Sequence, residues 1–314
     1  MRLDELRHRF QSWLIRQPDW SPAVVTALRP VEGGVSNLTF RATLSGAPAS
    51  EVALRLQREH GIFEPYDVLR EARVLRALAS SSVPVPGVLA VEPDPAPLGA
   101  PFAVLEWVDA PHMGVAGAEA DFGAYVATVV RIHELDWRGA GLEFLVERED
   151  VGEAVRGAVE RVAARAEAWG LGEDRELSRA EELLRDTVPE DGELTLCQGD
   201  INVFNYLFRA GRVVAVVDWE QAAIADPRLD VGQILALSHL KGAPWGSPER
   251  SAFVQEYVRR RRRPLAGLSW FRAYWLWQLA VIYEGWVRSN ESPPWYGREA
   301  VRGLLRLALE EVEA

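Results

Sequence analysis

Two acids and one amide near the middle of the chain have the types and the spacing for chemistry. Asp200 follows an apolar run, Asn205 comes five positions later, and Asp218 follows Asn205 by thirteen. Carboxylate and amide oxygens are the ligands that Mg²⁺ prefers, and a further carboxylate could accept a proton. The trio therefore suits metal and phosphate chemistry. Each aspartate could instead form a turn, which is the simpler interpretation of either residue taken alone.

Two short strands are expected to position this trio. Residues 213–217 are apolar and mostly β-branched, so they are predicted to form a buried strand that ends at Asp218. Ala210 and Gly211 provide a tight turn between this strand and the one before it. The two strands could bring the two acids and the amide to one point.

The chain before residue 109 is predicted to be rich in strands. Strands are expected over 38–44, 51–56 and 102–108, and a helix from Pro65 to about Ala79. Glu71 falls on the apolar stripe of that helix, so it needs a cationic partner inside. Residues 1–28 are predicted to hold a helix and a connection, with a helix start at Ser21 and Pro22.

Beyond residue 109 the chain is predicted to be mostly helical. Apolar residues recur at helical spacing in seven segments. These segments are 121–135, 151–169, 175–187, 229–240, 249–263, 267–288 and 298–313. The sequence therefore predicts an α+β protein with a small β-rich N-lobe, 1–108, and a large α-helical C-lobe, 109–314.

Composition narrows the class of partner. The chain has 314 residues, of which 48% are hydrophobic and 26% charged, as is usual for a globular protein. A formal net charge of −11 disfavours nucleic acid and anionic membrane surfaces as partners, and favours a cationic substrate only slightly. The single cysteine, Cys197, excludes an intramolecular disulfide. The first residues have no signal-peptide core, so the cytoplasm is the expected compartment.

Several short motifs occur in the order found in the aminoglycoside phosphotransferase family of small-molecule kinases. Residues 33–37 resemble the turn that covers the nucleotide, Val52-Ala53-Leu54-Arg55 resembles the kinase lysine strand, and Glu71 resembles the αC glutamate. Leu105 to Val108 resemble the hinge, and Gln198-Gly199-Asp200 with Asn205 resembles the catalytic loop. Asp218-Trp219-Glu220 resembles the metal-binding segment, and Asp226 to Asp230 resemble the segment that follows it. The sequence is most similar to the subgroup of kinase domains fused to acyl-CoA dehydrogenases.

The resemblance implies a protein-kinase-like bilobal fold and an ATP- and Mg²⁺-dependent transfer to a hydroxyl of a small molecule. Asp200 would accept the hydroxyl proton, and Asn205 and Asp218 would hold Mg²⁺. The nucleotide would contact the N-lobe at eight positions, Gly33, Gly34, Ser36, Asn37, Arg55, Glu71, Glu106 and Val108. Gln198 and Asp230 would support the loop. The two glycines could instead form a simple hairpin. The protein is expected to be a monomer or a homodimer.

Two positions depart from the family pattern. Gln198 replaces a histidine that braces the loop, and glutamine can also donate and accept hydrogen bonds. Arg55 replaces the kinase lysine, and its guanidinium can still pair with Glu71 and bind phosphate. These departures motivate an alternative function, a nucleotide-binding pseudokinase or regulatory module without turnover.

Weaker signals lie near the C-terminus. The arginine run 259–263 could attract an acidic group, but a solvated helix end is the simpler interpretation. Most of the tryptophans there, which are Trp270, Trp275, Trp277, Trp286 and Trp295, are expected in the core. Glu284 is a possible substrate contact. The five histidines lack metal-ligand spacing and are expected to be structural.

Overall fold

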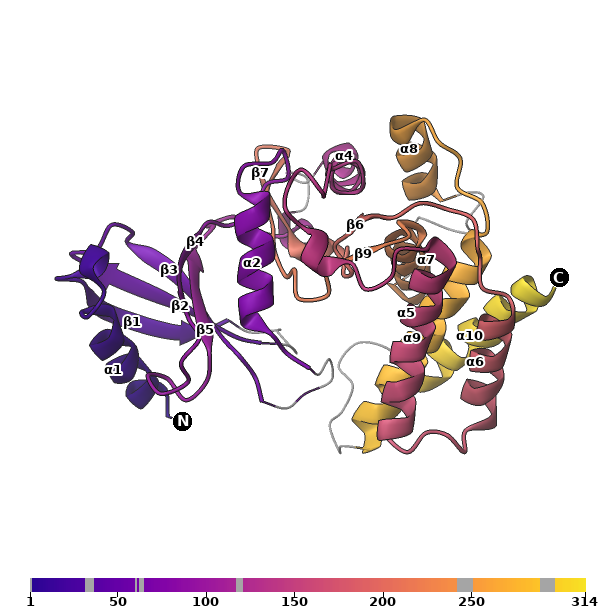
Figure 1. Cartoon of the computed structure of the whole chain (residues 1–314), viewed down its shortest axis with the longest axis horizontal. Helices are drawn as coiled ribbons and strands as arrows, with labels where there is room; N and C mark the ends of the chain where they lie inside the picture. The colour runs from indigo at the N-terminus through magenta and orange to yellow at the C-terminus, as the bar shows by residue number, and fades with distance from the viewer. Residues whose placement is uncertain are drawn as a thin grey trace. The chain divides into compact units, whose positions relative to one another are not determined.

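A computed structural model describes residues 2–31, 37–59, 61, 65–116, 121–241, 251–288 and 297–314. The chain divides into two compact units. The first unit contains Met1–Pro111 and Val214–Glu220, and the second contains His112–Val213 and Gln221–Ala314. The first is built on a sheet and the second on helices (Figure 1). The sheet and the helices confirm the predicted α+β class.

The first unit is a five-stranded antiparallel sheet with a helix on each side. Its strand order is β1-β2-β3-β5-β4. The strands are β1 (Val24–Pro30), β2 (Leu38–Ser45), β3 (Glu51–Leu56), β4 (Val88–Glu92) and β5 (Phe102–Glu106). Helix α1 (Leu3–Leu14) packs on β1, and α2 (Val68–Leu78) packs on β4 and β5 (Figure 1).

Strand β3 alternates between the two faces of this sheet. Val52, Leu54 and Leu56 are buried in the cluster that includes the apolar face of α1. Successive side chains in a strand point to opposite faces, so Arg55 points away from this cluster. Arg55 therefore lies on the face of the sheet that carries α2, where it pairs with Glu71.

The predicted helix start at Ser21 and Pro22 is wrong. Strand β1 begins at Val24 and pairs with β2, with Leu28 opposite Ala42. The residues Val24, Val25 and Thr26 are β-branched and fit a pleated strand, and the neighbouring strand supplies the pairing that the local signal did not include.

The second unit is built around helix α9 (Leu268–Arg288). It packs against α5, α6, α7 and α10. These helices are α5 (Val151–Ala168), α6 (Arg175–Asp186), α7 (Arg228–Lys241) and α10 (Arg298–Glu313). The predicted core tryptophans Trp270, Trp275, Trp277 and Trp286 are buried on α9, and Trp295 lies outside the described residues.

The other elements of the second unit are shorter. The helices are α3 (Met113–Ala116), α4 (Phe122–His133) and α8 (Ala252–Arg261). Two two-stranded sheets are present, β6 (Thr195–Cys197) with β9 (Ala223–Ala225), and β7 (Tyr206–Arg209) with β8 (Arg212–Val216). The division between the units falls within β8. None of the described helices combines the length and the apolar character needed to cross a bilayer.

Helices α7 and α9 approach each other closely at Gly232. A Cβ atom at Gly232 would lie 2.7 Å from the backbone carbonyl of Phe271 on α9. Real side chains do not tolerate such a distance to backbone atoms, so any larger residue forces the helices apart. This contact fixes the position of the α7 backbone.

We therefore expect Gly232→Ala to lower the free energy of unfolding by about 1–3 kcal/mol, because the methyl group overpacks the α7–α9 contact. Gly157→Ala in α5 is the matched control, since its Cβ would lie 3.6 Å from the Arg161 guanidinium, which is ordinary contact. There the better helix propensity of alanine should stabilise the protein by up to about 1 kcal/mol. Urea unfolding of both variants checks this, and equal effects would contradict it.

Candidate active site

The predicted catalytic loop, residues 198–205, follows β6 in the second unit. Gly199 has a φ of +83° in this loop. A Cβ atom there would lie 2.4 Å from the carbonyl oxygen of Gln221. Both the left-handed backbone and the close approach require glycine, and together they turn the chain so that Asp200 leaves the strand direction.

Three side-chain amides donate to the carboxylate of Asp200. Asn202 Nδ2 lies 2.8 Å from both carboxylate oxygens, and Asn205 Nδ2 lies 2.9 Å from Oδ2. Gln233 Nε2, on α7, lies 2.6 Å from Oδ1. Donors of this kind stabilise the ionised form of a carboxyl group and restrict its rotation. The loop thus presents a fixed carboxylate.

Asn205 is oriented by the same contacts. Its Nδ2 also donates to the backbone carbonyl of Asp200 at 2.8 Å. Because the amide group is turned toward Asp200, Oδ1 is the atom that a metal ion would use. Asn202 accepts from the backbone N–H of Phe204 and begins the 3₁₀ turn Val203–Asn205 that carries Asn205.

Asp230, in the first turn of α7, holds the backbone of the loop. Its two carboxylate oxygens accept the N–H groups of Gln198 and Gly199, at 2.9 and 3.0 Å. His133 Nε2 lies 3.1 Å from Asp230 Oδ2, and Tyr257 Oη lies 2.7 Å from His133 Nδ1. These are the contacts that the predicted supporting role of Asp230 requires. Gln198 is fully buried, and its Oε1 accepts from Tyr206 Oη at 3.4 Å.

His133, Cys197 and Asp230 form the one group of possible metal ligands found among the described residues. Their ligand atoms lie within 4.8 Å of one another, and all three residues are buried. His133 and Asp230 already bond to each other and to the loop or to Tyr257. Burial raises the pKa of the Cys197 thiol well above its usual value, which keeps the thiol protonated. The group therefore acts as a brace beneath the loop.

In the first unit, Arg55 pairs with three acids. Its Nη2 lies 2.9 Å from Glu71 Oε2, 3.0 Å from Asp218 Oδ1 and 3.7 Å from Glu220 Oε2. The cationic partner predicted for Glu71 is thus present. Although burial opposes the charge, the carboxylates of Glu71, Asp218 and Glu220 raise the pKa of Arg55. Arg55 therefore connects Glu71 of α2 to the segment that carries Asp218 and Glu220.

Asp218 has an unusual backbone conformation, with a φ of +63°. Few non-glycine residues adopt this left-handed region, and they concentrate at functional sites. The next residue, Trp219, is fully buried and donates its backbone N–H to Glu71 Oε1 at 3.3 Å. The same glutamate therefore orients Arg55 and the segment that carries Asp218.

Asn37 and the hinge complete the first unit's predicted residues. Asn37 is buried, donates to Glu220 Oε2 at 3.2 Å and accepts the backbone N–H of Arg58. Glu106 donates its N–H to the carbonyl of Gly87, and the carbonyl of Val108 accepts from Ala110. These two bonds fix the backbone at the end of β5 and just beyond it. Gly33, Gly34 and Ser36 lie outside the described residues.

The predicted residues thus form two hydrogen-bonded groups, one in each unit. Asn37, Arg55, Glu71 and Asp218 are linked in the first, and Gln198, Asp200, Asn205 and Asp230 in the second. The contacts of Asn202 and Gln233 with Asp200, and of Tyr257 with His133, were not predicted from the sequence. For Gln233 a signal existed, because it follows Asp230 by three positions and so shares its helix face.

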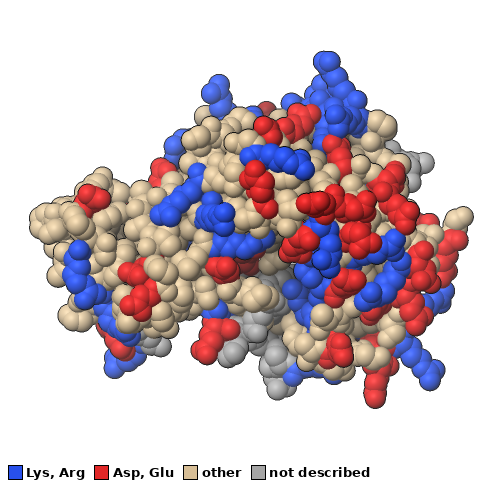
Figure 2. All heavy atoms as spheres, in the orientation of Figure 1, with Lys and Arg blue, Asp and Glu red and all other residues tan. Residues whose placement is uncertain are grey.

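Two weaker predictions have structural outcomes. Glu284 Oε1 accepts from Arg298 and Arg302, so its carboxylate joins α9 to α10 and we assign it a packing role. Basic side chains gather at α8 (Figure 2), where Arg259 and Arg260 pair with Glu256. Arg259 and Arg260 are exposed, as a solvated helix end predicts. Arg261 departs from this prediction, because it is buried and donates to Tyr257 Oη and to the carbonyl of His133.

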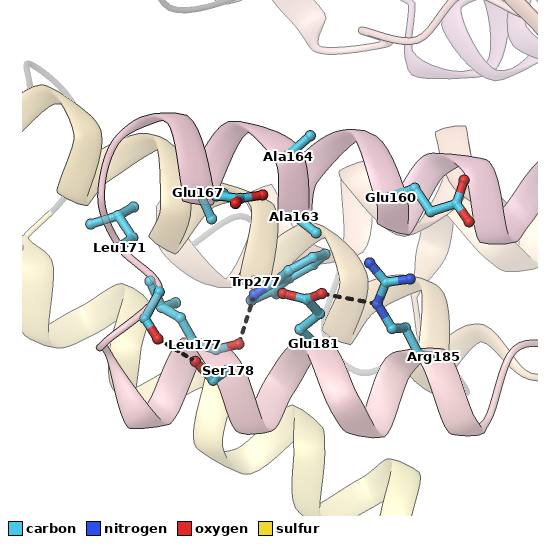
Figure 3. A pocket seen from close by; sticks show the side chains of 12 residues that line it. Glu160, Ala163, Ala164, Glu167, Leu171, Leu177, Ser178, Glu181, Arg185 and Trp277 are labelled. Atoms are coloured by element: carbon cyan, nitrogen blue, oxygen red, sulfur yellow. Dashed lines mark hydrogen bonds and ion pairs between the residues drawn. The ribbon is translucent and has the colours of Figure 1, made fainter.

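A cavity of about 470 Å³ lies between α5 and α6, with Trp277 of α9 at its base (Figure 3). Glu160, Glu167 and Glu181 line it, and Arg185 pairs with Glu181 at 2.9 Å. None of the predicted catalytic or metal-binding residues lines this cavity. It is therefore separate from the catalytic loop.

The family model described as "Phosphotransferase enzyme family" matches residues 27–274, and the chain belongs to this family. The predicted resemblance is confirmed. Acyl-CoA dehydrogenase family member 10 of Mus musculus is 27% identical over 213 residues, which are 63% of this chain and 19% of that protein. The chain thus spans about a fifth of this relative.

Solved structures establish the same fold. A presumed aminoglycoside phosphotransferase from Ralstonia eutropha has a TM-score of 0.72 and 21% identity, over 98% of each chain. A thermostable mutant of another aminoglycoside phosphotransferase, in a ternary complex with ADP and hygromycin B, has a TM-score of 0.62 and 15% identity. It covers 98% of this chain and 97% of its own.

The Arg55–Glu71 pair generates a stability prediction. Arg55→Met should lower the free energy of unfolding by about 3–5 kcal/mol, because it leaves the buried Glu71 carboxylate without its cation. The double variant Arg55→Met with Glu71→Leu should recover most of this loss, since both charges are then gone. Denaturant unfolding of the single and double variants measures the coupling. A single variant that loses less than about 1 kcal/mol would mean that the pair behaves as an exposed one.

Proposed function

We propose that this protein transfers the γ-phosphoryl group of ATP, with Mg²⁺, to a hydroxyl group of a small molecule. The observation that carries the proposal is the Asp200 carboxylate, which three amides hold on a loop whose backbone Asp230 braces. Phosphoryl transfer depends mainly on positioning and on charge neutralisation, and a fixed carboxylate meets the first of these needs. A cytoplasmic location, inferred from the sequence, belongs to the same proposal.

In the proposed reaction, Asp200 accepts the proton of the acceptor hydroxyl as its oxygen attacks the γ-phosphorus. The bond from this phosphorus to the bridging oxygen breaks, and ADP leaves. Asn205 Oδ1 and the Asp218 carboxylate are hard oxygen ligands that suit Mg²⁺, which would neutralise phosphate charge. Arg55 would bind phosphate oxygens while Glu71 keeps its guanidinium oriented.

The acceptor is proposed to be a small hydroxylated compound. A structural relative binds hygromycin B, and another solved structure of the same fold is described as a choline/ethanolamine kinase family protein. A protein acceptor is disfavoured because only eleven residues separate Asp218 from Asp230. That is too short for the activation segment on which peptide substrates of protein kinases dock.

Asp200→Asn tests the assigned base. The amide keeps the size of the side chain but cannot take a proton, so turnover should fall by about 10²–10⁴-fold, with ATP affinity retained. ATP consumption is measured over a panel of hydroxylated metabolites and antibiotics. Asp186→Asn, an exposed aspartate at the end of α6, is the matched control and should behave as wild type. Unchanged turnover in Asp200→Asn would refute the assignment.

Thermal shift combined with ATP consumption distinguishes a kinase from a pseudokinase, the rival that Gln198 and Arg55 motivate. Mg·ATP at 100 times its Kd should stabilise the folded protein by about 2.7 kcal/mol, and EDTA should remove most of this effect if Mg²⁺ bridges the protein to the phosphates. Stabilisation without ATP consumption by wild type or Arg55→Lys, with every acceptor, would favour the pseudokinase. Absence of any shift would contradict both functions.

A further inference from the structure

We infer that Gln233 of α7 is a positioning residue that fixes the orientation of the Asp200 carboxylate. The inference rests on the proposed function, in which Asp200 is the base. Gln233 Nε2 lies 2.6 Å from Asp200 Oδ1. The other two amide donors, Asn202 and Asn205, belong to the catalytic loop and move with it. Gln233 contacts the loop from α7, which packs on α9, so the position of its donor does not depend on the loop itself.

The spacing on α7 matches the spacing of the loop. Asp230 and Gln233 are three residues apart, so they lie on one face of the helix, about 4.5 Å apart along its axis. Asp230 accepts the N–H groups of Gln198 and Gly199, and Gln233 donates to the side chain of the next residue, Asp200. One helix face therefore contacts three consecutive residues of the loop.

The α7 backbone is itself fixed at the adjacent residue. Gly232 allows α7 to approach the backbone of Phe271 on α9 so closely that a Cβ would lie 2.7 Å from it. Gln233 therefore starts from a Cα that cannot shift toward α9. Its side chain is only 4% exposed, so it has little freedom to leave the loop.

The other end of the Gln233 amide shows that stability does not explain this residue. Its Oε1 is buried and has no hydrogen-bond partner among the described residues. Turning the amide over would place this oxygen 2.6 Å from a carboxylate oxygen, so the orientation is determined. A buried oxygen without a partner is destabilising, and an apolar side chain of the same length would avoid it. What glutamine provides here is the Nε2 contact with Asp200.

Gln233→Met tests the inference, because methionine fills the same volume and lacks the donor. Turnover should fall by about 10–100-fold with KM for ATP unchanged. Tm should stay close to that of wild type, because the lost bond to Asp200 and the removal of the unpartnered oxygen act in opposite directions. Gln233→Glu should lower turnover at least as much, because a carboxylate cannot donate to Asp200 and repels it.

Gln278→Met in α9 is the matched control. Gln278 is a half-buried glutamine whose Oε1 accepts from Tyr274 Oη at 2.9 Å, within the same helix. This variant should keep the wild-type kcat and the wild-type KM for ATP. The inference is overturned if Gln233→Met keeps both as well, or if its loss of kcat is matched by a lower Tm and by the same loss in Gln278→Met.

Crystal structures of wild type and Gln233→Met separate this inference from the proposed function. If no acceptor supports turnover in wild type, the proposed function fails, and the structures still decide the role of Gln233. An Asp200 carboxylate that turns away from Asn205 in Gln233→Met supports positioning. An Asp200 carboxylate in the same rotamer in both proteins overturns it.

Discussion

The second unit depends on one buried carboxylate, that of Asp230. Burying a charge is costly unless donors surround it. The Gln198 and Gly199 N–H groups supply two donors, and the His133 ring lies 3.1 Å away. Its position in the first turn of α7 adds the favourable end of the helix dipole. The loop therefore has one stable backbone conformation, and the position of Asp200 follows from it.

In the first unit, Arg55 has a comparable role, because its buried charge holds several segments together. The planar shape of its guanidinium group makes this possible. Nε donates to Glu71, Nη2 to Asp218, and Nη1 to Thr39 of β2. A lysine ammonium is a single point with three donors and could not span these groups in one plane. The departure from the kinase lysine thus keeps the glutamate pair and adds contacts that connect β2, α2 and the Asp218 segment.

Much of this arrangement could be predicted from the sequence. The inward-facing Glu71 required a cation, and Arg55 was the candidate that the motif order offered. The two strands missed in the first unit, β1 and β4, share a physical cause, since they are the two edges of its sheet. Edge strands are only half covered, so their burial pattern alternates weakly and the neighbouring strand decides their conformation. Strand β1 was also missed because Pro22, just before it, was interpreted as a helix start.

Gln233 was missed for a different reason. Its partner lies 33 positions earlier, on a loop, and no local periodicity reports such a contact. Asp230 was recognised because a motif contains it, whereas Gln233 lies just beyond that motif on the same helix face. The general lesson is geometric. Once one residue of a helix is known to hold a loop, residues three and four positions away become candidates for holding the next residues of that loop.

The two acids of the proposed reaction are positioned by different sets of contacts. Within the first unit, Asp218 pairs with Arg55, and the next residue, Trp219, donates its N–H to Glu71. Two residues before Asp218, Val216 donates its N–H to the carbonyl of Pro84. Asp200 is placed by α7 and by its own loop within the second. Changes in the outer helices α5, α6 and α10 need not disturb either set, because α7 meets the loop directly and is fixed on α9 at Gly232. The contacts that position the two acids can therefore be kept while these outer helices change.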